Sequence, residues 1–248
     1  MAAYGTAMDA RAVADALERD LAEHGTPERA EKERRYLKSE LRHLGASVPA
    51  TRAAVKRLVA GLPELTHDDA VDLAVALWDA PVHERRAAAV ELLDLRSDLL
   101  TAADLPVLER LLREARTWAL VDGLAASVVG AVRERHPDEA EPTLRAWAGD
   151  EDFWLRRASL LAYLVALRAG AGDFDRFADK ADRLLEDREW FVRKALGWVL
   201  RDTGRRRPAM VVDWLEPRVA RAAPLTLREA VKHLPDDDRA RLSRAADR

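Results

Sequence analysis

An internal repeat is the feature of this sequence that most constrains its fold. Six segments align so that one column holds a charged residue every 34 to 37 positions: Arg52, Arg86, Asp122, Arg157, Lys194 and Glu229. The next column holds only small residues, namely Ala53, Ala87, Gly123, Ala158, Ala195 and Ala230. A period of this length is typical of stacked helix pairs, and the small column is expected where helices pack closely.

A third column lies one helical turn before the charged one and is apolar in every segment. It holds Val48, Val82, Trp118, Phe153, Trp190 and Leu225. Residues four apart share one face of a helix, so this column predicts a common stripe of core residues.

The local patterns predict helices throughout the chain. Apolar residues recur at spacings of three and four, alternating β-branched runs are missing, and several of the 11 prolines stand where a first helical turn would begin. The Trp, Leu-Gly and Tyr pattern of tetratricopeptide repeats does not occur. We therefore expect an all-α fold, an α-solenoid of about six HEAT-like helix-pair repeats that is curved with a basic concave face.

Length and composition favour one repeat domain over residues 1–248, because 48% of the residues are hydrophobic and 34% are charged. Residues 1–25 are expected to form an N-terminal capping helix, and residues 235–248 a C-terminal cap or tail. No apolar run approaches the ~20 residues of a membrane span. Asp9, Arg11, Asp15 and Glu18 occupy the place of a signal-peptide core, so we expect a cytoplasmic protein.

Several kinds of chemistry find no support in the sequence. The chain has no cysteine, which excludes disulfides, thiolate zinc sites and thiol nucleophiles. Its six histidines are scattered without metal-ligand spacing, and it has no glycine-rich phosphate loop and no GxSxG motif. We expect neither a metal nor a small-molecule cofactor.

The charged column forms a ladder that is mostly basic, within a chain of net charge -3. The preceding column, which holds Thr51, Arg85, Val121, Arg156, Arg193 and Arg228, adds to it. Such a stripe is a reasonable track for an anionic polymer such as DNA. It is equally consistent with a solvated helix face held together by ion pairs along each helix.

Asp122 interrupts this ladder, either as an ion-pair partner of Arg86 or Arg157 or as a chemical group. Trp118 lies four residues earlier on the same helix face, where it belongs to the core or to a site. Trp198 occupies a slot that small or aliphatic residues fill in other repeats, which suggests a ring presented to a ligand.

Five segments resemble the DNA alkylation repair family, the AlkD-like alkylpurine DNA glycosylases with HEAT-like repeats. They are YLKSELRHLGASVPATR (36–52), LWDAPVHERRAAAVELL (77–93), TWALVDGLAASVVG (117–130), FWLRRASLL (153–161) and WFVRKALGWVLRD (190–202). The resemblance extends from Tyr36 to Leu234. It implies a basic groove for duplex DNA and hydrolysis of the N-glycosidic bond of positively charged N3- or N7-alkylated purines.

The resemblance also implies the site residues. The catalytic aspartate of the family matches Asp122, its two groove tryptophans match Trp118 and Trp198, its groove arginine matches Arg157, and an aromatic residue matches Tyr36. Charge adds DNA-backbone candidates: Lys38, Arg52, Arg86, Lys194, Arg205, Arg206 and Arg207. The family does not draw the damaged base into a pocket.

The expected function is therefore that of a monofunctional DNA glycosylase in base excision repair. Its partner would be double-stranded DNA with alkylated purines, bound by a monomer without cofactor or membrane, and a carboxylate would stabilise an oxocarbenium-like sugar. The alternative is a non-catalytic HEAT-like scaffold that binds protein partners or unusual DNA structures.

Overall fold

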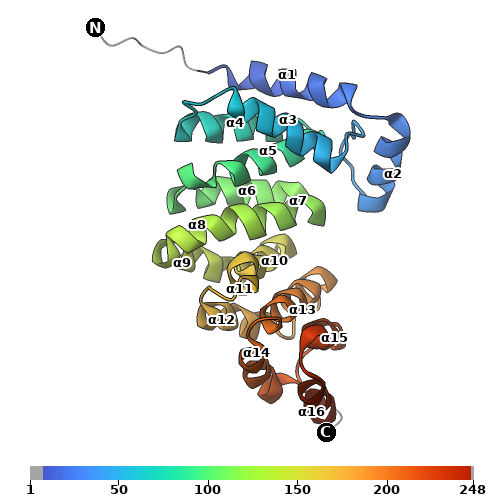
Figure 1. The fold of residues 1–248 in the computed structure, drawn as a ribbon, viewed down its shortest axis with the longest axis vertical. Coiled ribbons are helices and arrows are strands. Elements are labelled where there is room, and N and C mark those ends of the chain that lie inside the picture. Colours follow the sequence, from blue (N-terminus) through green and yellow to red (C-terminus); the bar gives the residue numbers. More distant parts are fainter. Residues whose placement is uncertain (1–7, 247–248) are drawn as a thin grey trace. The chain divides into compact units, whose positions relative to one another are not determined.

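The computed structural model describes residues 8–246, and this part of the chain consists of helices joined by short connections (Figure 1). Among these residues, backbone pairing of the β type is limited to two isolated bridges. The all-α prediction is confirmed. The chain forms two compact units, one of residues 8–104 and 114–124 and one of residues 105–113 and 125–246.

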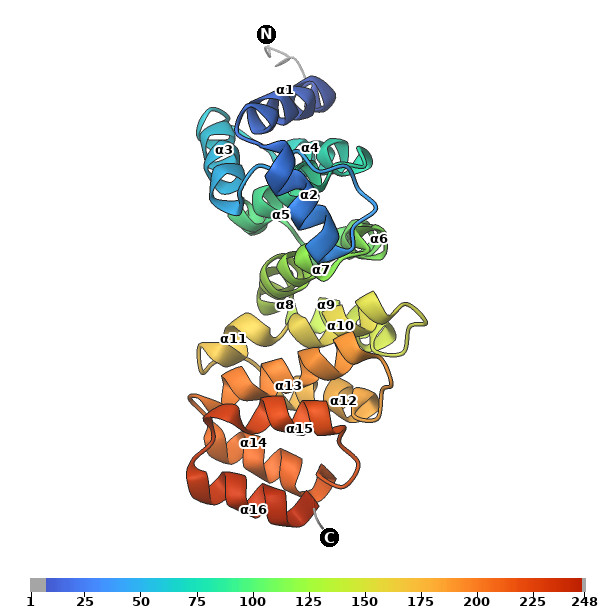
Figure 2. The ribbon, with the colours of Figure 1, turned by 90° about the vertical axis from the view of Figure 1, so that its right-hand side faces the viewer.

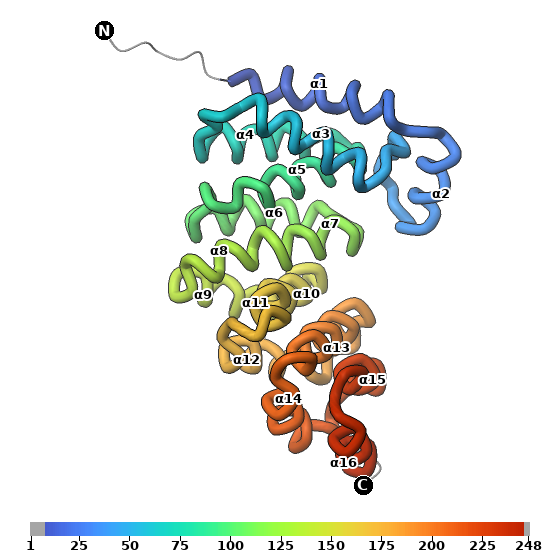
Figure 3. The backbone as a smooth tube through the Cα atoms, in the orientation of Figure 1, coloured from blue at the N-terminus to red at the C-terminus, as the bar shows by residue number. Residues whose placement is uncertain are grey.

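The first unit packs four helices against one another and carries a further helix beside them. They are α1 (Ala10–Glu23), α2 (Pro27–Leu37), α3 (Val48–Ala60), α4 (His67–Asp79) and α5 (His83–Leu95), followed later by α7 (Trp118–Gly123). The helix α5 packs against α3, α4 and α7, and α1 lies across α3 and α4 (Figure 3). Leu73, Leu77 and Trp78 of α4 are fully buried and form the centre of this core.

The second unit is organised around α13 (Trp190–Gly204), which packs against α10, α11, α14 and α15 (Figure 2). Its other helices are α8 (Gly130–Arg135), α9 (Pro137–Trp147), α10 (Phe153–Leu161), α11 (Leu164–Arg168), α12 (Phe174–Leu184), α14 (Pro208–Leu215), α15 (Pro224–Ala230) and α16 (Asp236–Ala246). The helix α6 (Leu105–Ala115) contributes its first nine residues to this unit and its last two to the first.

Local signals in the sequence explain where many helices begin. Side chains at the N-cap position accept a hydrogen bond from the first turn in six helices, at Asp9, Thr26, Ser47, Thr66, Asp152 and Asp173. Each such cap contributes about 1 kcal/mol of stability. Pro27 and Pro49 stand in the first turn of α2 and α3, where the missing N–H costs nothing.

The column of small residues marks close approaches between helices. A Cβ at Gly123 would lie 2.8 Å from Val90 Cγ1. Gly197 lies two residues after the column member Ala195 and marks a further close approach, because a Cβ there would lie 2.6 Å from Glu229 Cβ. Ala158, Ala195 and Ala230 are fully buried, whereas Ala53 is exposed. The small column therefore marks close packing at Gly123, Ala158, Ala195 and Ala230, whereas Ala53 is exposed and Ala87 is half-buried.

The apolar column is not the core stripe that its periodicity predicted. Among its six members only Val82 is buried, while Val48 and Trp190 are exposed and the other three are half-buried. The reason is their place in the helix. Five of the six occupy the first or second residue of a helix, and the sixth is an N-cap, so they lie at the end of a helix rather than inside the stack.

The expected caps fall where helices occur. The predicted N-terminal capping segment contains α1, with residues 1–7 outside the described part, and the predicted C-terminal cap contains α16, with residues 247–248 outside it. Over residues 8–246, the helices are too short or too polar to span a bilayer.

Candidate active site

Asp122 lies on α7 one turn after Trp118, with both side chains half-buried. The helix changes form directly after Gly123, because Leu124–Val129 is π-helical before α8 restores the ordinary pitch. Such π segments are rare and occur frequently at functional sites. The aspartate thus ends a regular helical turn at a point where the backbone departs from regular geometry.

Trp118 contacts Tyr36, the residue before the last of α2. The two ring centroids are 5.9 Å apart and the ring planes meet at 87°, an edge-to-face pair. Tyr36 is 71% exposed, which is unusual for an aromatic side chain. The structure therefore brings together Tyr36 and Trp118 in the first unit, and the site role of Trp118 stays a prediction.

Residues that follow Tyr36 in the sequence line a surface cavity of about 500 Å³. It is lined by Lys38, Ser39, Glu40, Leu41, Pro81, Arg86, Glu114, Ala115 and Arg116. Lys38 and Arg116 are the C-caps of α2 and α6, and they adopt left-handed backbone conformations with φ of 50° and 49°. Each of these conformations costs a residue with a Cβ about 1–2 kcal/mol. Strain of this kind concentrates at functional sites.

The basic residues at this cavity differ in whether their side chains already have hydrogen-bond or ion-pair partners within the protein. Arg116 lies 3.5 Å from Glu40. Arg86 donates to the backbone carbonyls of Trp78 at 3.1 Å and Glu114 at 2.7 Å. Lys38 is exposed, and within residues 8–246 its ammonium has no ion pair or hydrogen bond. Lys38 can therefore bind an anion at this cavity without first breaking a contact within residues 8–246.

Arg52, another predicted DNA-backbone residue, is exposed on α3 and pairs with Glu91 at 3.2 Å. An exposed pair of this kind contributes about 0–1 kcal/mol and exchanges readily with a phosphate oxygen. Its predicted role stays a prediction.

In the second unit, Arg157 lies on α10 and is only 3% exposed. Its guanidinium donates to the backbone carbonyl of Phe191 and lies 5.9 Å from the centroid of that ring. Phe153 stacks on the same Phe191 ring at 5.9 Å. These contacts fix Arg157 between α10 and the start of α13, and its predicted contact with a phosphate stays a prediction.

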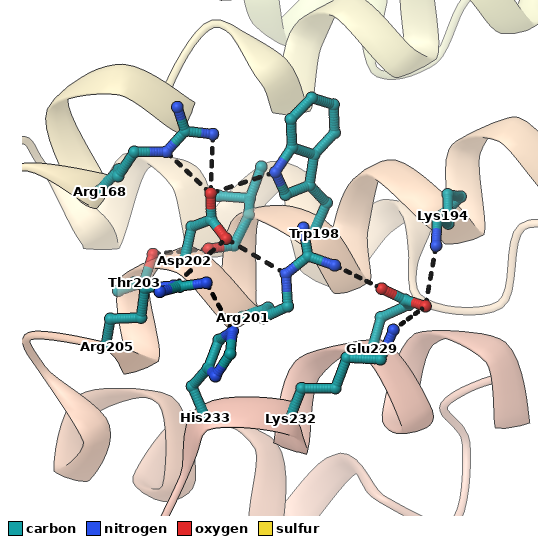
Figure 4. A network of polar contacts seen from close by, with 11 residues as sticks. Arg168, Lys194, Trp198, Arg201, Asp202, Thr203, Arg205, Glu229, Lys232 and His233 are labelled. Atoms are coloured by element: carbon teal, nitrogen blue, oxygen red, sulfur yellow. Dashed lines mark hydrogen bonds and ion pairs between the residues drawn. The ribbon is translucent and has the colours of Figure 1, made fainter.

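Trp198 is half-buried on α13, and its indole N–H donates to Asp202 Oδ2 at 3.1 Å, one turn further along the helix (Figure 4). Arg168 approaches from α11, with its guanidinium 6.0 Å from the Trp198 ring centroid and a hydrogen bond of 2.8 Å to Asp202. Burial alone would raise the pKa of Asp202, but the hydrogen bonds from Arg201 and Arg168 outweigh it and lower that pKa. The carboxylate therefore holds the Trp198 ring in place while staying ionised.

Arg201 links Asp202 to a second buried carboxylate, Glu229 (Figure 4). Glu229 also receives Lys194 at 2.8 Å and Lys232 at 2.7 Å. Burial alone would raise the pKa of Glu229, but the hydrogen bonds and charges of Lys194 and Lys232 lower it to about 2. Lys194, which was predicted to contact DNA, thus already forms an ion pair with Glu229, the next residue of the charged column.

A pH titration tests this network. The pKa of Glu229 is about 2 in the folded chain against an ordinary 4.5, so between these values only the unfolded chain takes up the proton. Stability is therefore present above pH 4.5 and falls as the pH drops toward 2, by about 3 kcal/mol. Denaturant unfolding of wild type and Glu229→Gln should show a gap in unfolding free energy at pH 6 that closes toward pH 2. A constant gap would contradict the assignment.

The three consecutive arginines after α13 have different surroundings. Arg205 donates to His233 at 2.7 Å, and Arg207 donates to the carbonyl of Ala171. Arg206 is exposed, and in the described part of the chain its side chain has no hydrogen bond or ion pair. Arg168, Asp202, Arg205 and Arg206 line a cavity of about 620 Å³, which is basic because three of its four lining residues are arginines.

Several cations of the ladder and of the column before it already form ion pairs, as Arg52 and Lys194 do. Arg85 is buried and pairs with Asp15 and Glu18 at 2.8 Å, and Arg156 pairs with Asp187 at 2.7 Å. These pairs join separate elements of the fold instead of running along one helix, which differs from the ion-pair pattern considered from the sequence. Among the predicted DNA-backbone residues, Lys38 and Arg206 are the ones whose side chains have no hydrogen bond or ion pair within residues 8–246.

Metal-ligating side chains converge at one place within residues 8–246, at Glu33, His43 and Glu84. None of the residues predicted for catalysis or DNA binding belongs to this group. Asp122 instead supplies a carboxylate, and Trp118 and Tyr36 near it supply aromatic rings. Both kinds of group stabilise a cation.

A family profile described as DNA alkylation repair enzyme matches residues 17–234 of the sequence. The chain belongs to this family. Membership gives it a role in the repair of alkylated DNA, with the enzymatic activity and DNA binding that such repair requires. The match includes all five segments on which the resemblance was based, so the recognition is confirmed.

Solved structures agree with this family fold. A predicted DNA alkylation repair enzyme from Enterococcus faecalis is similar with a TM-score of 0.76 and 24% identity, over 86% of this chain and 98% of that one. AlkD2 from Streptococcus mutans gives a TM-score of 0.64 and 17% identity, over 91% of this chain and 99% of that one. At such identities the likeness concerns the fold alone. No match is found among curated proteins.

Sequence reasoning missed several residues of the site. Asp202 stands four residues after Trp198 on one helix, so helical spacing was a signal that could have found it. Arg168 and Arg116 carried no such signal, because a contact across 34 positions and a left-handed C-cap are properties of the folded chain.

Proposed function

We propose that the protein hydrolyses the N-glycosidic bond of positively charged N3- or N7-alkylated purines in duplex DNA, with Asp122 as the catalytic carboxylate. The observation that carries the proposal is the position of Asp122, one turn after Trp118 of the Tyr36–Trp118 pair and two residues before a π-helical segment. Family membership supports the substrate class in its coarser form, alkylated DNA.

The chemistry requires little from the protein. An alkylated purine with a positive ring leaves as a neutral base, so positive charge moves to the sugar as the bond breaks. A carboxylate about 4 Å from that charge contributes roughly 4 kcal/mol at an effective dielectric constant near 20. This is about a thousandfold in rate. Asp122 also orients the attacking water as a weak general base.

Aromatic faces supply the second contribution. Trp118 and Trp198 each add about 0.5–2 kcal/mol where a cationic base or sugar faces the ring. Tyr36 supports Trp118 through their edge-to-face contact. The hydrogen bond from the Trp198 indole to Asp202 restrains the other ring, so little side-chain freedom is lost on binding.

Phosphates are held by cations that are free to bind them. Lys38 and Arg206 are exposed and come first, followed by exposed or partly exposed residues that exchange a protein partner for a phosphate oxygen. The latter group comprises Arg52, Arg86, Lys194, Arg205 and Arg207. Arg157 holds the start of α13 through Phe191 and reaches a phosphate by exchanging that carbonyl.

Substrate discrimination tests this proposal. Two otherwise identical duplexes would carry 7-methylguanine or hypoxanthine, and release of each base would be followed by chromatography. We expect release of the cationic base only, because the proposed chemistry includes no acid that protonates a neutral purine. Equal release of both bases would overturn the proposed mechanism.

A non-catalytic scaffold is the second candidate, and the ion pairs of Arg85, Arg156 and Lys194 favour it, because paired cations are less available to DNA. The two candidates differ in their salt dependence. A duplex-binding protein that neutralises several phosphates loses affinity steeply as salt rises, with a slope near -0.9 per phosphate. A protein scaffold shows no such duplex binding, and an inactive DNA-binding relative shows binding without base release.

A substitution at Lys38 should separate stability from DNA binding. Lys38→Gly removes the left-handed strain and should raise the unfolding free energy by about 0.5–1 kcal/mol. The same change removes one phosphate contact, so the salt slope of duplex binding should shrink by about 0.9. Lys38→Ala is the matched control, which keeps the strain and loses only the charge. Unchanged duplex affinity in both variants would remove Lys38 from the interface.

A further inference from the structure

We propose that Glu33, His43 and Glu84 bind a divalent transition-metal ion of the Zn²⁺ class in the first unit. Glu33 comes from α2, His43 from the connection between α2 and α3, and Glu84 from the first turn of α5. Their ligand atoms all lie within 4.8 Å of one another. One imidazole nitrogen and two carboxylate oxygens, completed by water, form a ligand set that suits Zn²⁺ and its neighbours.

The imidazole of His43 is available as a ligand. Both of its ring nitrogens are buried, and neither has a hydrogen-bond partner in the described part of the chain. The ring stacks on His83 with centroids 4.5 Å apart and planes 9° from parallel. A buried nitrogen without a partner costs free energy, and a coordinated cation removes that cost.

The carboxylate of Glu84 carries a buried charge that backbone groups alone satisfy among the described residues. Glu84 is only 2% exposed, and it accepts the N–H groups of Leu44 at 2.9 Å and Gly45 at 2.6 Å. A carboxylate has about four lone-pair sites, so two stay open for a cation. Buried charges are ordinarily paired or coordinate metals, and no cationic side chain pairs with Glu84 in this part of the chain.

The connection that carries His43 is fixed on both sides. Arg42 forms two backbone hydrogen bonds of 2.9 Å around the start of α5: its N–H donates to the carbonyl of Pro81, and its carbonyl accepts from the N–H of His83. Gly45 follows with φ of 84°, and a Cβ there would lie 2.1 Å from the carbonyl oxygen of Thr26. The position of His43 beside Glu84 is therefore set by the backbone, as a metal site requires.

Small movements complete the coordination sphere. Bonds of about 2.0–2.2 Å place tetrahedral ligands about 3.4 Å apart, closer than the upper limit observed here. Glu33 is the adjustable member, because it is half-buried and its partner is Arg29 one turn away, in an exposed pair that costs little to break. Two of the three ligands also line a cavity of about 170 Å³, since Glu33 and Glu84 both border it.

His67 shows what distinguishes this cluster from an ordinary histidine among carboxylates. Its two ring nitrogens already engage Asp68 at 2.8 Å and Asp104 at 2.9 Å. These hydrogen bonds raise the pKa of His67, which favours an imidazolium rather than a ligand. His67 therefore provides a matched control for a substitution at His43.

The experiment measures Zn²⁺ binding to the full chain after removal of metal with a chelator, by titration calorimetry at pH 7. Wild type and His67→Asn should bind one Zn²⁺ per chain with equal affinity, while His43→Asn and Glu84→Gln should bind at least tenfold more weakly. Co²⁺ provides a second readout, since its visible absorption bands report the ligand set and should weaken in His43→Asn.

Two results would overturn the site. One is a wild-type chain that binds no Zn²⁺. The other is a His43→Asn chain, shown by circular dichroism to keep its helices, that binds Zn²⁺ and Co²⁺ as wild type does. If neither His43→Asn nor Glu84→Gln folds, the wild-type chain still decides: Co²⁺ absorption bands typical of histidine and carboxylate ligands support the site, and the bands of hydrated Co²⁺ reject it. These readouts are independent of base release.

Discussion

Replacing Asp122 with asparagine should lower the single-turnover rate of 7-methylguanine release about a thousandfold. The change keeps the size of the side chain and removes its charge, so it deletes the roughly 4 kcal/mol that a carboxylate about 4 Å from the sugar cation contributes. Duplex affinity should stay within a few-fold of wild type, because the negative charge acts chiefly in the transition state. The measurement is base release under enzyme excess, alongside duplex binding.

Two further variants define this result. Asp122→Glu keeps the charge but displaces it, and it should retain a rate between those of wild type and Asp122→Asn. Asp213→Asn removes a carboxylate from an exposed position of α14 and should leave the rate unchanged. Wild-type release by Asp122→Asn would remove Asp122 from the mechanism.

Replacing Asp202 with alanine should lower both stability and base release. Asp202 accepts hydrogen bonds from Arg168, Arg201 and Trp198, and hydrogen bonds to a charged group contribute about 1.5–3 kcal/mol each. Arg201 keeps Glu229 as a partner, so we expect a net loss of about 2–3 kcal/mol. The thermal midpoint should then fall by about 5–10 °C.

The asparagine variant separates the two roles of Asp202. Asp202→Asn keeps an acceptor for the Trp198 indole while it removes the charge. It should therefore lose stability but retain most of the rate, whereas Asp202→Ala releases the ring and loses rate as well. Equal rates in wild type and both variants would show that the position of Trp198 does not depend on Asp202.

Periodicity predicted the fold because each repeat carries the same local information. The close approach at Gly123 occurs where the small column placed it, and the helices begin near the prolines that marked their first turns. The apolar column was misread because helical spacing reports which face a residue occupies and not where along the helix it lies. Trp190, at the first residue of α13, is accordingly 53% exposed.

The site was predictable only as far as its residues share a helix. Trp118 and Asp122 are four residues apart, and so are Trp198 and Asp202, which places each pair on one face. Tyr36 came from the resemblance alone, since its contact with Trp118 spans more than 80 positions. Spacing cannot report such contacts, because tertiary packing decides them.

The same limit explains the charges. Arg85 appeared to belong to a basic stripe, but its partners Asp15 and Glu18 are 70 and 67 positions away. The histidines seemed scattered for the same reason. His43 and His83 are far apart in the sequence and stacked in the structure.

One measurement addresses the central proposal most directly: release of free base by the unmodified protein from a duplex that contains one 7-methylguanine. The protein would be in excess, and spontaneous depurination in buffer would serve as the reference. We expect release well above that reference, with an abasic site left in an otherwise intact strand. A rate equal to spontaneous depurination, with the duplex demonstrably bound, would contradict the proposed enzyme.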